Sequence, residues 1–270
     1  MTSTLTRISP SAAERAAGAF EGTTLALAAR ALRVDGALVV EDVIGPALIA
    51  EARAFFLERY ARYLDGTSCA DAQTVGPGRS MITVTVEPPF DNPQLFANPW
   101  LVSILSAALD ADFVVDSLGV VCSLPSAEAQ PRHRDGAPLF PAGLDALLPT
   151  TAITLGIPLR EMNEQNGTTG ILRGSHRPTD AKKEPEEEVA PVVREGSAIL
   201  WDYRVLHGGT ANRSAAPRQL LYLACCRPWF VDHRNFARPG ERQIPLVVSE
   251  ASFSKLSAAH QHLLTRAVVR

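Results

Sequence analysis

The chain has 270 residues, a length that single β-rich domains commonly reach, and 46% of its residues are apolar, which is enough to build a substantial core. Its formal net charge is −3 and its Lys and Arg residues are scattered, which argues against nucleic acid or a membrane surface as a partner. No apolar run approaches the ~20 residues that cross a bilayer, and the first residues lack the pattern of a secretory signal. We therefore expect a cytoplasmic protein.

The first part of the chain is expected to be mainly helical. Residues 10–33 are rich in Ala and Leu with two glycine interruptions, and residues 46–64 begin with a proline and carry apolar side chains at helical spacing. The short apolar run at 37–40 predicts a strand between them. A glycine-rich polar loop is expected at 65–80, followed by a β-branched strand, "MITVTVEP", and a helix, "NPWLVSILSAALD".

The pattern changes near residue 113, where short apolar runs begin to alternate with turn signals. Runs such as "TAITLGIPLR", "SAILWDYRVLH" and "RQLLYLACC" predict the short strands of a β-sandwich or barrel. The tail "SFSKLSAAHQHLLTRAVV" is expected to return to helix. We therefore expect one domain that is mainly β with flanking helices: a mostly helical part with edge strands at 1–112, a β-rich core at 113–235 and a helical tail at 236–270.

The cysteines do not suggest a disulfide framework. The chain has 4 cysteines, none of them in a Cys-x-x-Cys pair, so we expect small buried residues in a reducing compartment. Cys225 and Cys226 are neighbours on an apolar run, and alternation along a strand would direct them to opposite faces.

The stretch "EAQPRHRDGAPLF" contains His133 and Asp135 as His-x-Asp. Taken alone, this tripeptide also fits a surface turn, but in an extended segment the two side chains point to the same side and can meet one metal ion. His207 ends the apolar run "AILWDYRVLH" where a strand enters a turn, and would supply a third ligand from a neighbouring strand. Two imidazoles and one carboxylate form the facial triad of non-heme Fe(II) oxygenases, with positions left open for a co-substrate and O2. We expect the remaining histidines to be structural or exposed.

A 2-oxo acid co-substrate would chelate the iron and place its far carboxylate against a buried cation. Arginine suits this role because its guanidinium pairs with a carboxylate through two hydrogen bonds. Arg218 lies 11 residues after His207, at the start of "RQLLYLACC", and a hairpin-like return would bring it to the same interior. Arg213 is the alternative, but it lies in the turn itself and is expected to be solvated.

The motifs "QPRHRDG", "NGTTGILRGSH" and "LWDYRVLHGGTANRSAAPR", in this order, resemble the phytanoyl-CoA dioxygenase family of Fe(II)/2-oxoglutarate-dependent oxygenases, and the similarity extends over residues 35–235. The resemblance implies that the β-rich core is a double-stranded β-helix, the cupin-like jelly roll. It also implies that His133, Asp135 and His207 hold iron, and that Arg218 binds the far carboxylate of 2-oxoglutarate.

Further residues take expected roles from the same resemblance. Gln130 matches a position that contacts the co-substrate, although an ordinary surface strand residue is the alternative. Thr151 and Thr168 are expected to line the same pocket. His176 ends the motif Gly-Ser-His as a structural residue, and Trp201 is expected to pack in the core of the barrel.

The sequence departs from the family pattern in two places. Some relatives carry a hydroxyl residue two positions after the histidine that corresponds to His207, where it helps to hold 2-oxoglutarate. This chain has Gly209 at that position, so Thr210 or a water would take over this role. Arg173 replaces the usual proline before Gly-Ser-His, and would place a charge near the mouth of the site. Asp135 is retained, whereas relatives that halogenate have a small residue there, so halogenation is not expected.

The expected function is that of a 2-oxoglutarate-dependent dioxygenase that hydroxylates an unactivated C–H bond of a small-molecule metabolite or natural-product intermediate, releasing succinate and CO2. Desaturation, epimerisation and ring formation remain open. The alternative is a cupin-like metalloprotein with Zn2+ or Mn2+, acting as an isomerase, a hydrolase or a non-catalytic ligand sensor, and a buried arginine argues against it. The chain is expected to be a monomer or a homodimer.

Three loops are expected to close over the substrate pocket above the iron. They contain residue types that suit a mixed apolar and anionic ligand: Arg79, Phe140, Phe230 and Arg234.

Overall fold

The computed structural model describes residues 4–64, 72–136, 139–140, 144–177, 188–232 and 246–270. Its centre is an eight-stranded sheet. Across this sheet the strands are β1 (Thr6–Ile8), β2 (Ala37–Val40), β10 (Ala198–Asp202), β7 (Ala152–Pro158), β12 (Arg218–Cys226), β6 (Val114–Ser123), β4 (Arg79–Thr83) and β3 (Gln73–Thr74). All of these pairs are antiparallel except β1 with β2.

Two smaller sheets complete the β structure. One faces the large sheet and consists of β11 (His207–Gly209), β8 (Thr169–Leu172) and β9 (Glu188–Val189). The other joins the end of the chain to its middle and consists of β14 (Val268–Val269), β13 (Val247–Val248) and β5 (Thr85–Val86). A large sheet that faces a smaller one is the arrangement expected for a double-stranded β-helix, and the predicted fold class is confirmed.

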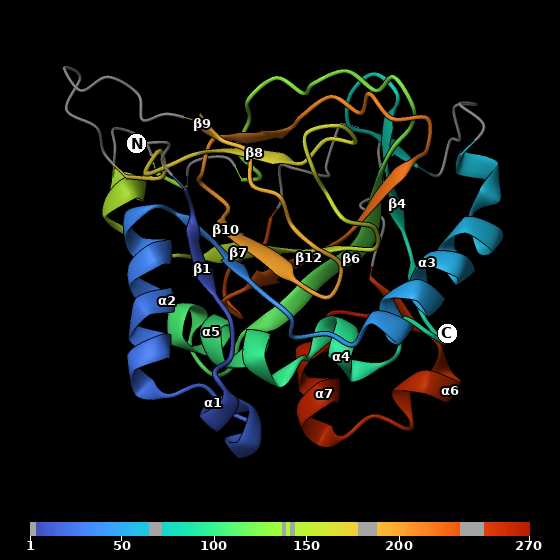
Figure 1. Ribbon diagram of the computed structural model, residues 1–270. Helices are drawn as coiled ribbons and strands as arrows, with labels where there is room; N and C mark the ends of the chain where they lie inside the picture. Colours follow the sequence, from blue (N-terminus) through green and yellow to red (C-terminus); the bar gives the residue numbers. More distant parts are fainter. Residues whose placement is uncertain (1–3, 65–71, 137–138, 141–143, 178–187, 233–245) are drawn as a thin grey trace.

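Helices cover the other face of the large sheet (Figure 1). They are α1 (Ala12–Ala17), α2 (Gly22–Val34), α3 (Pro46–Arg59), α4 (Pro93–Phe96), α5 (Pro99–Leu109), α6 (Glu250–Phe253) and α7 (Ala258–Leu263), with short 3-10 turns at Ala61–Tyr63 and Leu144–Leu147. Asn98 begins α5 by accepting a hydrogen bond from Trp100 N–H, and Pro99 fits the first turn because its missing N–H has no partner in a helix anyway.

The sheets and helices enclose two cores. Side chains on one face of the large sheet, such as Leu200 and Leu223, pack against the helices. Side chains on the opposite face, such as Trp201 and Leu220, pack toward the small sheet. Cys225 belongs to the first core and Cys226 to the second, as the alternation along β12 predicts, whereas Cys69 lies outside the described residues.

Two predicted helices are broken. The helix expected at 10–33 is divided because Gly18 takes a left-handed conformation, with φ 69°, and ends α1. The helix expected in the tail is also divided, because Ser257 caps a new helix by accepting a hydrogen bond from His260 N–H. The end of the chain is a strand, since Val268–Val269 pairs with β13.

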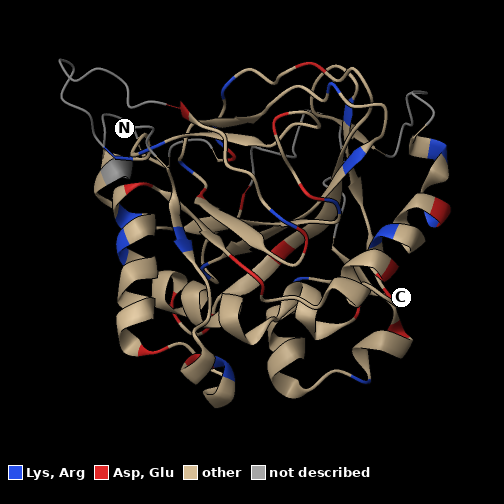
Figure 2. Cartoon of the chain, viewed as in Figure 1, with Lys and Arg blue, Asp and Glu red and all other residues tan. Residues whose placement is uncertain are grey.

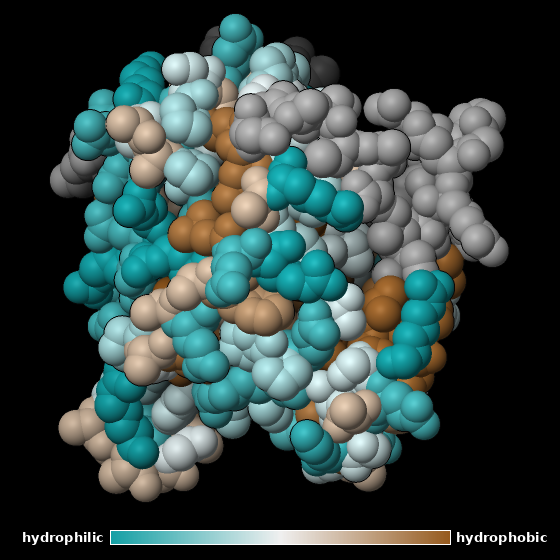
Figure 3. Space-filling model, turned by 90° about the vertical axis from the view of Figure 1, so that its right-hand side faces the viewer, coloured by the Kyte–Doolittle hydropathy of each residue, from teal (hydrophilic) through white to brown (hydrophobic). Residues whose placement is uncertain are grey.

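The surface carries both signs of charge, interspersed over the described helices and strands (Figure 2). The face shown in Figure 3 is a mosaic of hydrophilic areas and smaller apolar ones. Among the described residues, no helix has the length and apolar character that crossing a membrane requires.

Candidate active site

His133 and His207 are brought together by a short antiparallel bridge between two segments that are distant in the sequence. Each residue donates its backbone N–H to the other's carbonyl at 2.9 Å. Because Asp135 lies two positions after His133 in the same extended segment, its side chain returns to the side of the two imidazoles. The ligand atoms of His133, Asp135 and His207 all lie within 4.8 Å of one another, which makes this the one group of three potential metal ligands among the described residues.

Both imidazoles are oriented so that one nitrogen remains free for a metal. His133 Nδ1 lies 3.0 Å from Pro131 O, and His207 Nδ1 lies 3.0 Å from Val205 O. A carbonyl oxygen only accepts, so each Nδ1 carries the proton and each Nε2 offers its lone pair to an ion. The two rings are 4.5 Å apart between centroids.

Asp135 is buried and remains ionised. Burial acts to raise the pKa of its carboxyl, but His207, the Thr154 hydroxyl and His133 outweigh this effect and lower it. The pKa of His207 is raised: burial opposes protonation, whereas Asp135, with Oδ1 3.4 Å from His207 Nε2, favours it. Burial and the neighbouring His207 lower the pKa of His133. A buried anion between two imidazoles is the electrostatic setting in which a divalent cation is stabilised.

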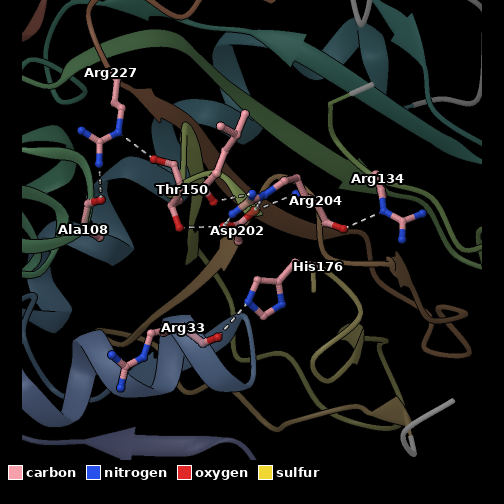
Figure 4. Close-up of polar contacts among 9 residues, drawn as sticks. Arg33, Ala108, Arg134, Thr150, His176, Asp202, Arg204 and Arg227 are labelled. Atoms are coloured by element: carbon pink, nitrogen blue, oxygen red, sulfur yellow. Dashed lines mark hydrogen bonds and ion pairs between the residues drawn. The ribbon is translucent and has the colours of Figure 1, made fainter. Parts of the chain in front are cut away.

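A buried ion pair holds the turn that leads into His207 (Figure 4). Asp202, 1% exposed, accepts two hydrogen bonds from the Arg204 guanidinium, at 2.9 and 2.8 Å, and one from the Thr150 hydroxyl at 2.8 Å. Arg134, between the two predicted ligands, donates to Arg204 O at 2.7 Å. The segments that carry the three ligands are thus tied to one another through polar contacts behind the site, so the triad is largely pre-organised.

Arg218 lies in the barrel interior, as predicted, and a second buried arginine accompanies it. Arg218 is 1% exposed and Arg79 is 2% exposed, and both donate to the Ser123 hydroxyl, at 2.8 and 2.7 Å. Burial lowers the pKa of Arg79 to about 10, and burial together with the charge of Arg79 lowers the pKa of Arg218 to about 9, so both are cationic at neutral pH.

The two arginines form a site for an anion. Among the described residues no carboxylate pairs with either of them, and Arg218 Nε is buried without a hydrogen-bond partner. Two buried cations without a counter-charge are unfavourable unless an anion joins them. A carboxylate fits this place, since it matches the planar fork of a guanidinium.

Gln130 connects the anion site to the metal ligands. Its side-chain Oε1 accepts a hydrogen bond from Gly209 N–H at 2.8 Å, and its amide nitrogen donates to Val75 O. The carbonyl of Gly209, two residues after His207, accepts a hydrogen bond from Arg79 Nη1 at 3.2 Å. In this arrangement the amide of Gln130 positions the backbone beside the anion site.

Arg79 explains why position 209 is a glycine. A Cβ added to Gly209 would lie 2.8 Å from Arg79 Nη1, so a side chain at 209 and the guanidinium compete for the same space. The expectation that Arg79 lies in a loop over the substrate is wrong, because Arg79 begins β4 and points into the barrel. The available signal was its position directly before the β-branched run "MITVTV", since an arginine that begins such a strand and faces inward requires an anion or an acceptor.

The two threonines expected in the pocket are both buried. The hydroxyl of Thr168 donates to Pro191 O at 2.6 Å, and its backbone N–H donates to the Thr210 hydroxyl at 2.7 Å. Thr210, the proposed substitute at the co-substrate, is therefore occupied by the backbone of Thr168. Thr151 accepts a backbone hydrogen bond from Arg227 at the start of β7. Their contacts with a ligand remain predictions.

Three further residues that the sequence singled out have structural or surface positions. Arg173 pairs with Asp35, with 2.7 Å between Nη2 and Oδ1, so its charge is neutralised at the end of α2. His176 is buried and its ring contacts Arg33 O at 3.2 Å, a structural position (Figure 4). Arg213 is exposed, as expected for a residue of the turn.

Of the expected pocket residues, Phe230 is buried and packs edge-on against Tyr203, which also contacts the backbone of Asp135. Phe140 is 49% exposed. Arg234 lies outside the described residues.

The sequence profile of the phytanoyl-CoA dioxygenase (PhyH) family matches residues 32–220. The chain belongs to this family. Among curated relatives of this PhyH protein, dioxygenase trt7 of Aspergillus terreus is 25% identical over 204 residues, which cover 72% of this chain and 70% of the relative.

Solved structures share the PhyH fold of this chain. The non-heme α-ketoglutarate-dependent carbocyclase SnoK from nogalamycin biosynthesis superposes with a TM-score of 0.56 at 18% identity, covering 74% of this chain and 83% of SnoK. The epimerase SnoN, determined with Fe3+, α-ketoglutarate and nogalamycin RO, gives 0.55 at 19% identity, covering 84% of this chain and 94% of SnoN. At these identities the likeness shows the fold.

Proposed function

We propose that this PhyH protein is an Fe(II)/2-oxoglutarate-dependent dioxygenase that hydroxylates an unactivated C–H bond of a small-molecule metabolite or natural-product intermediate. One observation carries the proposal: two histidines and a carboxylate with metal-ligand geometry adjoin two buried arginines that have no counter-charge among the described residues. A divalent metal alone would need the first group only. A co-substrate that is both a chelate and an anion needs both groups.

The residues fit both ligands. His133 Nε2, His207 Nε2 and one oxygen of Asp135 would hold the iron, since these donors suit non-heme Fe(II) and leave one face of the ion open. Arg218 would bind the far carboxylate of 2-oxoglutarate through its free Nε, and Arg79 would balance the remaining charge from across Ser123. When bound, iron and 2-oxoglutarate supply the oxidative chemistry that yields succinate and CO2.

Gln130 and the two threonines have supporting roles in this proposal. Gln130 would act through Gly209, holding the backbone that Arg79 also contacts, and so would shape the pocket for the co-substrate. Thr151 and Thr168 are proposed to lie along its wall, where both are buried. Asp135 argues for C–H oxidation rather than halogenation, because its carboxylate fills the position that a halide would take.

A small apolar or mixed substrate is supported by the residues beside the triad. Tyr203 is buried and accepts a hydrogen bond from Asp135 N–H, and the buried Phe230 packs against its ring. Leu139 and Phe140 are partly exposed on the chain that follows Asp135. The structural neighbours SnoK and SnoN both come from nogalamycin biosynthesis, which favours a natural-product intermediate as the substrate. Because one is a carbocyclase and the other an epimerase, hydroxylation is the part of the proposal that most needs a direct test.

The test measures turnover of 2-oxoglutarate in the absence of the unknown substrate. We expect slow succinate formation that requires both Fe(II) and O2. Asp135→Ala should abolish it, whereas Asp110→Ala, which changes an exposed carboxylate, should not. Succinate formation that persists in Asp135→Ala, or activity with Zn2+ under anaerobic conditions, would contradict the proposal. Products of candidate substrates, identified by mass as gain of one oxygen, would establish hydroxylation.

A further inference from the structure

The outer oxygen of Asp135 is held by two donors from the barrel floor. Trp201 Nε1–H donates to Asp135 Oδ2 at 2.8 Å, and the Thr154 hydroxyl donates to the same oxygen at 2.6 Å. The other oxygen, Oδ1, faces His207 Nε2 at 3.4 Å. The two oxygens of the carboxylate therefore differ: Oδ2 accepts two hydrogen bonds from the protein, whereas Oδ1 faces the other two proposed metal ligands.

The fold places these two donors together. Trp201 on β10 and Thr154 on β7 are register partners on adjacent antiparallel strands, so their side chains project from the same face of the sheet, directly below Asp135. Trp201 is 2% exposed and Thr154 is 0% exposed, so water does not compete for the outer oxygen. A buried charge-assisted hydrogen bond of this kind fixes orientation strongly.

The hydrogen bonds to Oδ2 limit the ways in which Asp135 can bind a metal ion. A carboxylate binds a metal through one oxygen or through both. If both oxygens of Asp135 bound the ion, they would take a position on the open face that the co-substrate and O2 require. An oxygen that already accepts two short hydrogen bonds has little lone-pair density left for a metal.

We propose that Trp201 and Thr154 are positioning residues that restrict Asp135 to binding the metal through Oδ1 alone, which keeps the third open coordination position available. This inference rests on the proposed function, because it concerns the same metal. It assigns a role to Trp201 beyond that of a core residue: its ring lies beside His207, with 5.1 Å between centroids, and its N–H orients the carboxylate.

The residue types match the role. The indole N–H donates and never accepts, so it cannot reverse the polarity of the contact. The Thr154 hydroxyl is in turn 3.4 Å from the Tyr222 hydroxyl, which lies in the same buried interior and orients it. A side chain that served packing alone at 201 would not need a nitrogen, and phenylalanine would replace it with little effect on the metal.

The experiment counts waters on a bound metal, and needs no turnover. The metal-free protein is loaded with Mn(II), and the relaxation of water protons gives the number of exchangeable waters, about three for an octahedral ion with three protein donors. We expect the double variant Trp201→Phe/Thr154→Val to carry about one water fewer, because the freed Oδ2 turns to the ion. Its affinity for 2-oxoglutarate in the Mn(II) form should fall ~10-fold.

Thr154→Ser is the matched control, because it keeps the hydroxyl and should retain the wild-type water number. If the double variant does not fold, the comparison of Thr154→Val with Thr154→Ser decides, with the same expected direction and a smaller change. An unchanged water number and unchanged 2-oxoglutarate affinity in the variants, with Mn(II) bound, would overturn the inference. A wild-type protein that binds no Mn(II), or whose bound waters 2-oxoglutarate does not displace, would instead contradict the proposed function.

Discussion

Replacing Arg218 with methionine should stabilise the ligand-free protein while it destroys the co-substrate site. The Arg218 and Arg79 nitrogens that contact Ser123 lie 2.8 and 2.7 Å from its oxygen, so they are at most 5.5 Å apart. At an effective dielectric constant of ~20, two unit charges at this separation repel by about 3 kcal/mol. Arg218 also leaves its Nε unsatisfied and buried, which adds about 1–3 kcal/mol.

Methionine removes both unfavourable contributions and retains most of the apolar volume. Its introduction loses two hydrogen bonds of the guanidinium, one to the Ser123 hydroxyl and a weaker one to Met162 Sδ, together worth about 1–2 kcal/mol. The difference of these contributions predicts that Arg218→Met raises the unfolding free energy of the ligand-free protein by about 2–5 kcal/mol and its Tm by ~5–10 °C. Binding of 2-oxoglutarate should weaken by about 3 kcal/mol, or ~100-fold, because its far carboxylate loses a buried partner.

The assay is thermal unfolding with and without 2-oxoglutarate, in a buffer free of carboxylate and phosphate, together with calorimetric titration of the Mn(II) form. Wild type should gain stability from 2-oxoglutarate and the variant should not. The matched control is Arg213→Met, an exposed arginine five residues earlier, which should change neither quantity. An Arg218→Met variant that is less stable than wild type and binds 2-oxoglutarate equally well would refute the reasoning.

Three further outcomes follow from the contacts of the site. Gly209→Ser should destabilise the protein by about 1–3 kcal/mol through collision with Arg79, and Arg79→Ala should relieve most of this loss in a double-mutant cycle; simple additivity would mean that the two side chains do not compete. Asp202→Asn should lower the unfolding free energy by about 3–5 kcal/mol because a neutral amide no longer balances the buried charge of Arg204, and a change of Tm under ~3 °C would argue against this. Burial raises the pKa of the Cys122 thiol to about 12, so a thiol reagent at pH 8 should modify Cys122 only after unfolding, as peptide mapping would show.

The three proposed metal ligands could be named from the sequence because part of their arrangement is local. His133 and Asp135 are two positions apart in an extended segment, so sequence spacing alone places both side chains on one side. His207 was a candidate third ligand because it ends a strand before a turn. Its bridge to His133 spans more than 70 residues, and the resemblance to the family implied the same grouping. Arg218 followed from the strand that it begins and from its offset to His207.

Arg79 could not be recognised because its environment is made by distant segments. Its guanidinium is held by Ser123 on β6 and by the carbonyls of Gly209 and Thr210. The glycine-rich sequence before it indicated a loop, whereas pairing with β6 continues the large sheet through it. The same limit applied to Trp201, which the resemblance to the family correctly placed in the core without indicating that its N–H donates to Asp135.

The C-terminal secondary structure differs from the prediction because of a local helix-capping residue. A serine inside the expected C-terminal helix competes for backbone N–H groups and begins a second helix, which the average composition of the tail does not reveal. The division into parts at 1–112, 113–235 and 236–270, like the oligomeric state, remains a prediction.

The central claim is that His133, Asp135 and His207 hold an iron that 2-oxoglutarate chelates, and anaerobic visible spectroscopy tests it most directly. Addition of Fe(II) and 2-oxoglutarate to the wild-type protein should produce a weak charge-transfer band that neither gives alone. The band should be absent from His207→Ala and retained in His262→Ala, which changes an exposed histidine of α7. A wild-type protein without the band, or a band of unchanged intensity in His207→Ala, would contradict the account.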